Sequence, residues 1–182
     1  MDQVWCEIDT QSLEANARVF RRLVGEDTLL AVAVKANGYG HGAVIAARAF
    51  LAGGADWLCV HSVSEAAELR GAGIDAPIYL VGPVALDELE KATALNLRMV
   101  VYNSETIERL IALGSPARLH IKIETGNHRQ GIGIPEAVSL ADAIGHAPHL
   151  QLEGVCSHFA NIEDTTDHRY ARQQLSLSLI HI

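Results

Sequence analysis

Residues 29–42 read LLAVAVKANGYGHG, and this stretch decides the fold because six apolar residues lead directly into Lys35. A continuous apolar run followed by glycines at every second position predicts a buried parallel β-strand that ends in a tight turn. Ligands of α/β proteins collect at the carboxyl ends of such strands. Burial there disfavours the charged ammonium, so Lys35 is a candidate nucleophilic amine for Schiff-base chemistry.

The loop after this lysine contains Gly38, Gly40 and Gly42. These glycines leave backbone N–H groups unshielded and can adopt positive φ, which a loop needs in order to approach a phosphate closely. Tyr39 adds a phenol that can donate one more hydrogen bond. Two alternatives stay open on the pattern alone. Lys35 could extend into solvent from the strand end, or the loop could be a dinucleotide fingerprint, although its spacing differs from G-x-G-x-x-G.

Composition limits the class of protein. The chain has 182 residues, 49% hydrophobic, with 15 glycines and 5% aromatic residues, which suits one α/β domain. A formal net charge of -8 without a basic run argues against a nucleic acid or an anionic membrane as partner, so we expect a small molecule. The sequence has no basic leader with an apolar core and no apolar stretch of the ~20 residues that span a bilayer, which predicts a cytoplasmic location.

The three cysteines are Cys6, Cys59 and Cys156. They are widely separated and lack C-x-x-C or His/Cys ligand spacing, so neither a disulfide framework nor a metal site is expected. We interpret them as buried reduced thiols.

Apolar runs and helical spacing alternate along the chain. The predicted strands are 29–34, 57–60, 78–81, 98–102, 119–123 and 150–156; the predicted helices are 42–51, 64–72, 86–95, 104–113 and 135–144, with Ser64 and Ser104 as N-caps and a sixth helix beginning within 164–174. Right-handed crossovers would roll six βα units into most of a (β/α)8 TIM barrel, although an open doubly wound sheet has the same pattern.

The segment Ala33–Gly42 closely resembles the pyridoxal-phosphate signature of the bacterial alanine racemases, fold type III enzymes with a barrel domain and a β-rich C-terminal domain. Further matches are 4–9, 54–58, 65–70, 122–126, 129–131 and 153–160. The resemblance implies an α/β fold, an incomplete (β/α)8 TIM barrel from which the family's C-terminal β domain is absent. It implies pyridoxal 5'-phosphate as cofactor, with Lys35 as its anchor and as a catalytic base, and Tyr39 as a cofactor-binding residue.

Three further residues take their roles from the resemblance. Lys122 matches a lysine that is typically carbamylated, and the resulting anion orients the arginine that matches Arg129. That arginine binds the phenolic oxygen of the cofactor and helps to place the substrate carboxylate. His158 matches a histidine that lies against the pyridine ring of the cofactor. Without the resemblance, Lys122 and Arg129 would be interpreted as a solvated pair beside Glu124, and His158 as a core or loop histidine.

The match is imperfect between residues 124 and 129. Many family members have Asp-Thr-Gly-Met-Gly-Arg there, whereas this chain has ETGNHR. The lysine and arginine anchors keep their register. Asn127 and His128 alter the substrate pocket, so serine or another small amino acid is an alternative substrate.

The implied reaction interconverts L- and D-alanine and supplies D-alanine for cell-wall peptidoglycan. Inversion needs a second acid/base on the opposite face of the planar carbanion. In the family this residue is a tyrosine from the C-terminal domain of the partner subunit, which implies a homodimer. No such tyrosine is identifiable in these residues, so we expect the chain alone to have little activity. Alternative interpretations are a non-catalytic pyridoxal-phosphate carrier with the same barrel and a cofactor-free Schiff-base aldolase.

The last six residues form an unusual segment. Residues 177–182, LSLIHI, are what CTG-TCT-CTT-ATA-CAC-ATC encodes, a transposon adapter used in preparing DNA libraries. We therefore expect a partial racemase-type barrel over residues 1–176 and a non-native tail over 177–182. A short edge strand is the alternative interpretation of this alternating segment.

Overall fold

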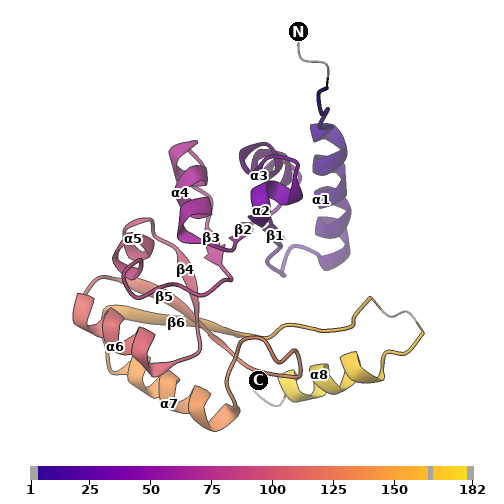
Figure 1. The fold of residues 1–182 in the computed structure, drawn as a ribbon. Helices are drawn as coiled ribbons and strands as arrows, with labels where there is room; N and C mark the ends of the chain where they lie inside the picture. Colours follow the sequence, from indigo (N-terminus) through magenta and orange to yellow (C-terminus); the bar gives the residue numbers. More distant parts are fainter. Residues whose placement is uncertain (1–3, 164–165, 180–182) are drawn as a thin grey trace. The chain divides into compact units, whose positions relative to one another are not determined.

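A computed structural model describes residues 4–163 and 166–179 of the chain (Figure 1). Within them, six parallel strands alternate with helices, as the sequence predicts. Contacts divide the chain into two compact units, the first within Met1–Val84 and Ala94–Leu97 and the second within Ala85–Thr93 and Arg98–Ile182. None of the described helices is long and apolar enough to cross a membrane.

The first unit is built around three short parallel strands that pair in the order β1, β2, β3. Its core is formed by alternate side chains of these strands; Leu58, Val60, Ile78 and Leu80 are fully buried. The elements are α1 (Thr10–Val24), β1 (Ala31–Ala33), α2 (Lys35–Tyr39), α3 (Ala43–Ala52), β2 (Trp57–Val60), α4 (Val63–Gly71) and β3 (Ile78–Leu80).

Helix α1 precedes the first strand and was not expected from the sequence. It begins at Asp9, whose carboxylate accepts hydrogen bonds from the N–H groups of Gln11 and Ser12 at 2.9 and 3.0 Å. The hydroxyl and the N–H of Ser12 hold the pKa of Asp9 below its ordinary value. The helix packs against α3 so closely that a Cβ at Gly53 would lie 2.5 Å from the carbonyl oxygen of Glu14.

The second unit contains three parallel strands that pair in the order β4, β5, β6. Helices α6 and α7 lie side by side (Figure 1), and α7 packs against β5 and β6. The elements are α5 (Leu89–Ala94, of which Ala94 belongs to the first unit), β4 (Arg98–Val101), α6 (Ser104–Leu113), β5 (Ala117–Lys122), α7 (Ile134–Gly145), β6 (Leu150–Cys156) and α8 (Arg169–Leu179).

A polar cluster lies across these three strands at an irregularity of the sheet. The pairing of β5 with β6 shifts between Leu119 and His120, which leaves Glu153 as the extra residue of a bulge. Its carboxylate lies 2.9 Å from Nε of Arg98, 3.3 Å from Nε of Arg118 and 3.4 Å from Nε2 of His120. Burial lowers the pKa of His120, against the opposing effect of Glu153. The cluster therefore links all three strands through one anion.

Both predicted N-caps were wrong by one or two residues. Helix α4 is capped by Ser62 rather than Ser64, because Ser62 and Glu65 form a reciprocal capping box. Helix α6 is capped by Asn103 rather than Ser104, because the Asn103 side chain accepts from a backbone N–H in the first turn. In each case the residue that precedes the first helical residue supplies the acceptor.

Other expectations need smaller corrections. The first strand covers only three residues of the predicted run, whereas the last described helix begins at Arg169, inside the predicted range 164–174. None of the three cysteines is fully buried as predicted: Cys59 and Cys156 are half-buried, and Cys6 is exposed because residues 4–9 form no helix or strand. Residues 177–179 continue helix α8 and do not form an edge strand, while 180–182 lie outside the described residues. The assignment of 177–182 as a non-native tail stays a prediction.

Candidate functional site

Lys35 lies two residues beyond the end of β1, where the sequence predicts a reactive amine. The preceding Val34 is fully buried and donates its N–H to the carbonyl of Cys59 on β2 at 2.9 Å. The Lys35 side chain is half-buried. Burial raises the pKa of the Cys59 thiol to about 11, and the positive charge of Lys35 opposes this rise. The amine therefore lies at the carboxyl end of the strands and near a half-buried thiol.

The backbone after Lys35 turns in the left-handed direction over four consecutive residues. Ala36, Asn37, Gly38 and Tyr39 have φ of 52°, 54°, 62° and 53°. For non-glycine residues this conformation costs roughly 1–2 kcal/mol each, less for asparagine, and runs of it are rare. The predicted positive φ of the loop glycines is confirmed, with 93° at Gly40 and 86° at Gly42 among them. Strain at the three other residues was not predicted.

Local hydrogen bonds hold this turn in place. The side chain of Asn37 accepts from the N–H of Ala43 at 2.9 Å and so caps the start of α3. Nδ1 of His41 lies 2.8 Å from the carbonyl oxygen of Gly38. Gly38 is buried, and a Cβ there would lie 3.1 Å from the Cβ of Ala46, so the turn packs directly on α3.

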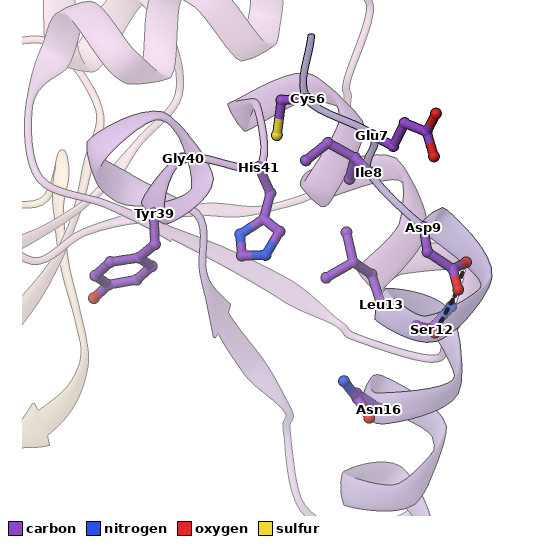
Figure 2. Close-up of a pocket in the computed structure, with 10 residues that line it drawn as sticks. All are labelled: Cys6, Glu7, Ile8, Asp9, Ser12, Leu13, Asn16, Tyr39, Gly40 and His41. Carbon is purple, nitrogen blue, oxygen red and sulfur yellow. Dashed lines mark hydrogen bonds between the residues drawn. The ribbon is translucent and has the colours of Figure 1, made fainter. Parts of the chain in front are cut away.

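An open pocket of about 470 Å³ adjoins the turn (Figure 2). Tyr39 lines it and is 61% exposed, so its phenol is accessible to a ligand. The pocket lies between the turn and the segment that leads into α1, and Lys35 is not among its lining residues. Those residues are Cys6, Glu7, Ile8, Asp9, Ser12, Leu13, Asn16, Tyr39, Gly40 and His41.

In the second unit, Lys122 is the last residue of β5 and is 8% exposed. Burial lowers the pKa of Lys122 below its ordinary value, and the charge of Arg129 lowers it further. Cys156 and Glu124 raise the pKa but do not cancel the effect of burial. Lys122 and Cys156 are paired in the register of β5 and β6. The interpretation of Lys122 as a solvated lysine is therefore wrong, and its surroundings favour the neutral amine.

The loop after Lys122 folds around the carboxylate of Glu124. Burial would raise the pKa of Glu124, but N–H donors of Gly126, His128 and Asn127 and the charge of His128 together hold it below the ordinary value. His128 adopts a φ of 51° within this loop. Arg129 follows at once, is exposed, and lies near enough to Lys122 to act on its pKa.

Helix α8 holds the loop that carries His158. The side chain of Gln174 is 1% exposed, yet both of its polar atoms are used. Its Oε1 accepts from the N–H of Ala160 at 2.9 Å, and its Nε2 donates to the carbonyl of His158 at 3.1 Å. The residue His158 itself is exposed.

The same helix reaches the loop after β5. The Tyr170 hydroxyl donates to the carbonyl oxygen of Gly126, and the hydroxyls of Thr125 and Ser157 are hydrogen-bonded to each other. These contacts join the loop that follows β5 to the loop that follows β6. Sequence reasoning missed Tyr170 and Gln174, because their partners are backbone groups far away along the chain.

The predicted site residues fall into two groups. Lys35 and Tyr39 share one turn of the first unit, while Lys122, Arg129 and His158 belong to the second. Among the residues 4–163 and 166–179, no group of three His, Cys, Asp or Glu side chains is arranged to hold a metal ion. Lys35 and Tyr39 supply an amine and a phenol in the first unit, and Arg129 and His158 supply a guanidinium and an imidazole in the second. Each pair can donate hydrogen bonds to an anionic ligand.

Comparison with known proteins matches this chain to a single family. The family model described as "Alanine racemase, N-terminal domain" matches residues 8–178. The alanine racemase of Symbiobacterium thermophilum is 39% identical over 179 residues, which cover 96% of this chain and 47% of that protein. Alanine racemase 2 of Oceanobacillus iheyensis is 40% identical over 175 residues, with 93% and 44% covered.

Solved structures agree with this comparison. The alanine racemase from Bacillus anthracis with bound L-Ala-P matches with a TM-score of 0.92 and 31% identity, covering 100% of this chain and 48% of that one. The alanine racemase from E. faecalis matches with a TM-score of 0.90 and 34% identity, covering 95% and 48%. The chain thus spans about half the length of its relatives. These matches confirm the incomplete (β/α)8 barrel over the alternative of an open doubly wound sheet.

Proposed function

Because this chain belongs to the family of alanine racemase N-terminal domains, we propose that it forms the cofactor-binding barrel of a pyridoxal-phosphate-dependent alanine racemase. The observation that carries the proposal is the left-handed turn beside Lys35. Strained backbone of this kind persists where the surrounding structure holds it, and it gathers at functional sites. Here the strain lies directly after the amine that the family signature marks.

The residues present fit pyridoxal phosphate by the chemistry of their donors. Lys35 supplies a primary amine for a Schiff base, and Tyr39 has an exposed phenol that can donate to a phosphate oxygen. Arg129 has five N–H donors suited to anionic oxygens. His158 would lie against the ring of the cofactor, as its match in the family does. When bound, the cofactor supplies an electron sink for the negative charge that develops at the substrate α-carbon.

The protein's own part in the reaction is proton transfer and charge placement. The Nζ atom of Lys35, once neutral, accepts the α-proton on one face of the substrate or returns it there. Arg129 donates to the substrate carboxylate and fixes its orientation. A second base on the opposite face is required, and we propose that it comes from a partner subunit of a homodimer.

Lys122 is proposed to be carbamylated. Its neutral amine would add to carbon dioxide, forming an N–C bond and releasing one proton, so that a neutral buried group becomes an anion. That anion would accept hydrogen bonds from the nearby Arg129 and fix its guanidinium. Burial of Lys122 supports this proposal, because the reaction requires the unprotonated amine.

The test uses the complete gene product. Purified protein is incubated with pyridoxal phosphate, reduced with borohydride and digested, and the labelled peptide is identified by mass spectrometry. This chain has three lysines, Lys35, Lys91 and Lys122, so a label on a peptide from it is assigned to one of these three. We expect the label on Lys35, loss of L- to D-alanine conversion in Lys35→Ala, and no loss in Lys91→Ala, whose residue is exposed. Conversion of alanine that survives in Lys35→Ala contradicts the proposal.

The same assay separates the alternatives. Faster conversion of serine than of alanine would assign a different small amino acid, which the changed residues Asn127 and His128 make worth measuring. A labelled protein without racemase activity would be a pyridoxal-phosphate carrier. A role in supplying D-alanine for peptidoglycan and a cytoplasmic location stay predictions.

A further inference from the structure

Glu65 on α4 has more hydrogen bonds than helix capping requires. Its Oε2 accepts from the N–H of Ser62 at 3.3 Å, as a capping box demands, and also from the N–H of His61 at 2.6 Å. Its Oε1 accepts from the N–H of Ala36 at 2.7 Å, across 29 residues of sequence. One carboxylate therefore joins the segment after β1 to the segment after β2.

The partner on the β1 side is the residue that matters for chemistry. Ala36 follows Lys35 directly and is the first residue of the left-handed turn. A hydrogen bond from an N–H to a carboxylate is about twice as strong as one between neutral groups. Fixing the Ala36 N–H fixes the peptide plane that joins it to Lys35, and so sets the direction in which the lysine side chain leaves the backbone.

We propose that Glu65 is a positioning residue that holds the strained turn and thereby orients the Lys35 amine. This inference rests on the proposed function, because it assigns to Lys35 the role of cofactor anchor. Glu65 acts through the backbone and touches no reacting atom. Its carboxylate accepts hydrogen bonds from backbone N–H groups that follow two neighbouring strands, β1 and β2, at the edge of the sheet where the Lys35 amine lies.

Glu65→Gln, normally a conservative substitution, should be unfavourable at this position. A carboxylate has two accepting oxygens, and here each faces a backbone donor on a different segment. Glu65→Gln keeps the shape but replaces one acceptor by an NH2 group, which would meet an N–H donor. The glutamine can satisfy the β1 side or the β2 side, but not both.

The control is Ser62→Ala. This substitution removes the hydroxyl that accepts from the Glu65 N–H, so it weakens the cap of α4 while leaving all three hydrogen bonds of the carboxylate in place. If Glu65 acts only by capping the helix, both variants should behave alike. If it positions the turn, only Glu65→Gln should affect Lys35.

Two measurements on the complete gene product test the proposal. Amide hydrogen exchange in the peptide that covers residues 36–42 should be about tenfold faster in Glu65→Gln than in the parent, and unchanged within about twofold in Ser62→Ala. The initial rate of borohydride-trapped labelling of Lys35 by pyridoxal phosphate should fall by about tenfold to hundredfold in Glu65→Gln alone.

Unchanged exchange and labelling in Glu65→Gln, or equal losses in Ser62→Ala, would overturn the proposal. Failure of the proposed function has a different signature, namely a parent protein that takes no label at Lys35. The exchange measurement needs no cofactor, so it still decides whether Glu65 holds the turn.

Discussion

Gln174 offers a direct test of how α8 fixes the loop of His158. The substitution Gln174→Met keeps the length of the side chain and removes both of its hydrogen bonds. The two partners that lose them are the N–H of Ala160 and the carbonyl of His158, at 2.9 and 3.1 Å. The Gln174 side chain is 1% exposed and both hydrogen bonds are part-buried, so water can replace the lost bonds only in part.

The magnitude follows from these contacts. Leaving a buried backbone donor or acceptor without a partner costs about 1–3 kcal/mol, so two such groups would cost about 2–6 kcal/mol. Because both bonds are only part-buried, we expect a loss of about 2–4 kcal/mol in the free energy of unfolding. Gln174→Ala should lose about 1 kcal/mol more, because it also leaves a small cavity. The neighbouring Gln173 is exposed, and Gln173→Met should change stability by less than about 0.5 kcal/mol.

The assay is urea unfolding of the complete gene product, compared at equal slope so that a shift of midpoint reports stability. The reasoning is refuted if Gln174→Met unfolds within about 0.5 kcal/mol of the parent, or if Gln173→Met is equally damaging. Amide exchange of the peptide around His158 should accelerate in the Gln174 variants alone, which would localise the effect to this loop.

Three further predictions concern burial, packing and charge. The fold lowers the pKa of Lys122, so in bicarbonate-free buffer the contribution of Lys122 to stability rises as the pH rises towards its ordinary pKa of 10.5. At neutral pH, Lys122→Met should therefore be more stable than the parent. Added bicarbonate should stabilise only the parent, and thermal unfolding measures both effects. Gly53→Ala should cost about 1–3 kcal/mol because its Cβ meets the carbonyl of Glu14, whereas Gly71→Ala, with open space around it, should not be destabilising in the same denaturation assay. Glu153→Gln should lose about 1–3 kcal/mol because it leaves half-buried cations without their anion, and a loss below about 0.5 kcal/mol would show that the cluster is dispensable.

The strands could be predicted because their signal is local. A strand of a parallel sheet is covered on both faces, so it appears in the sequence as a continuous apolar run. Ile78 and Leu80, both fully buried, are examples, and the predicted run there differs from the observed strand by one residue. The ends of elements were less predictable, because the side chain that caps a helix is chosen by backbone geometry among several neighbouring polar residues.

Helix α1 was missed although its sequence contains the signals of a helix. Asp9 is a good N-cap, and Arg21 and Arg22 lie in the last turn, where cations are favourable. Its apolar residues Leu13, Ala17, Phe20 and Val24 also recur at helical spacing, so one face of the segment is apolar. The local sequence therefore indicates this helix as clearly as it indicates the strands.

The turn after Lys35 marks the limit of prediction from sequence at this site. Gly38 could be expected to adopt positive φ, because glycine does so at no steric cost. Ala36 and Tyr39 could not, because their own preference opposes the conformation that they adopt. What outweighs that preference is contact with distant residues, above all the carboxylate of Glu65, 29 positions away from Ala36. The position of a reactive lysine at a strand end can therefore be predicted from the local sequence. The orientation of its amine cannot, because it depends on hydrogen-bond partners far away in the sequence.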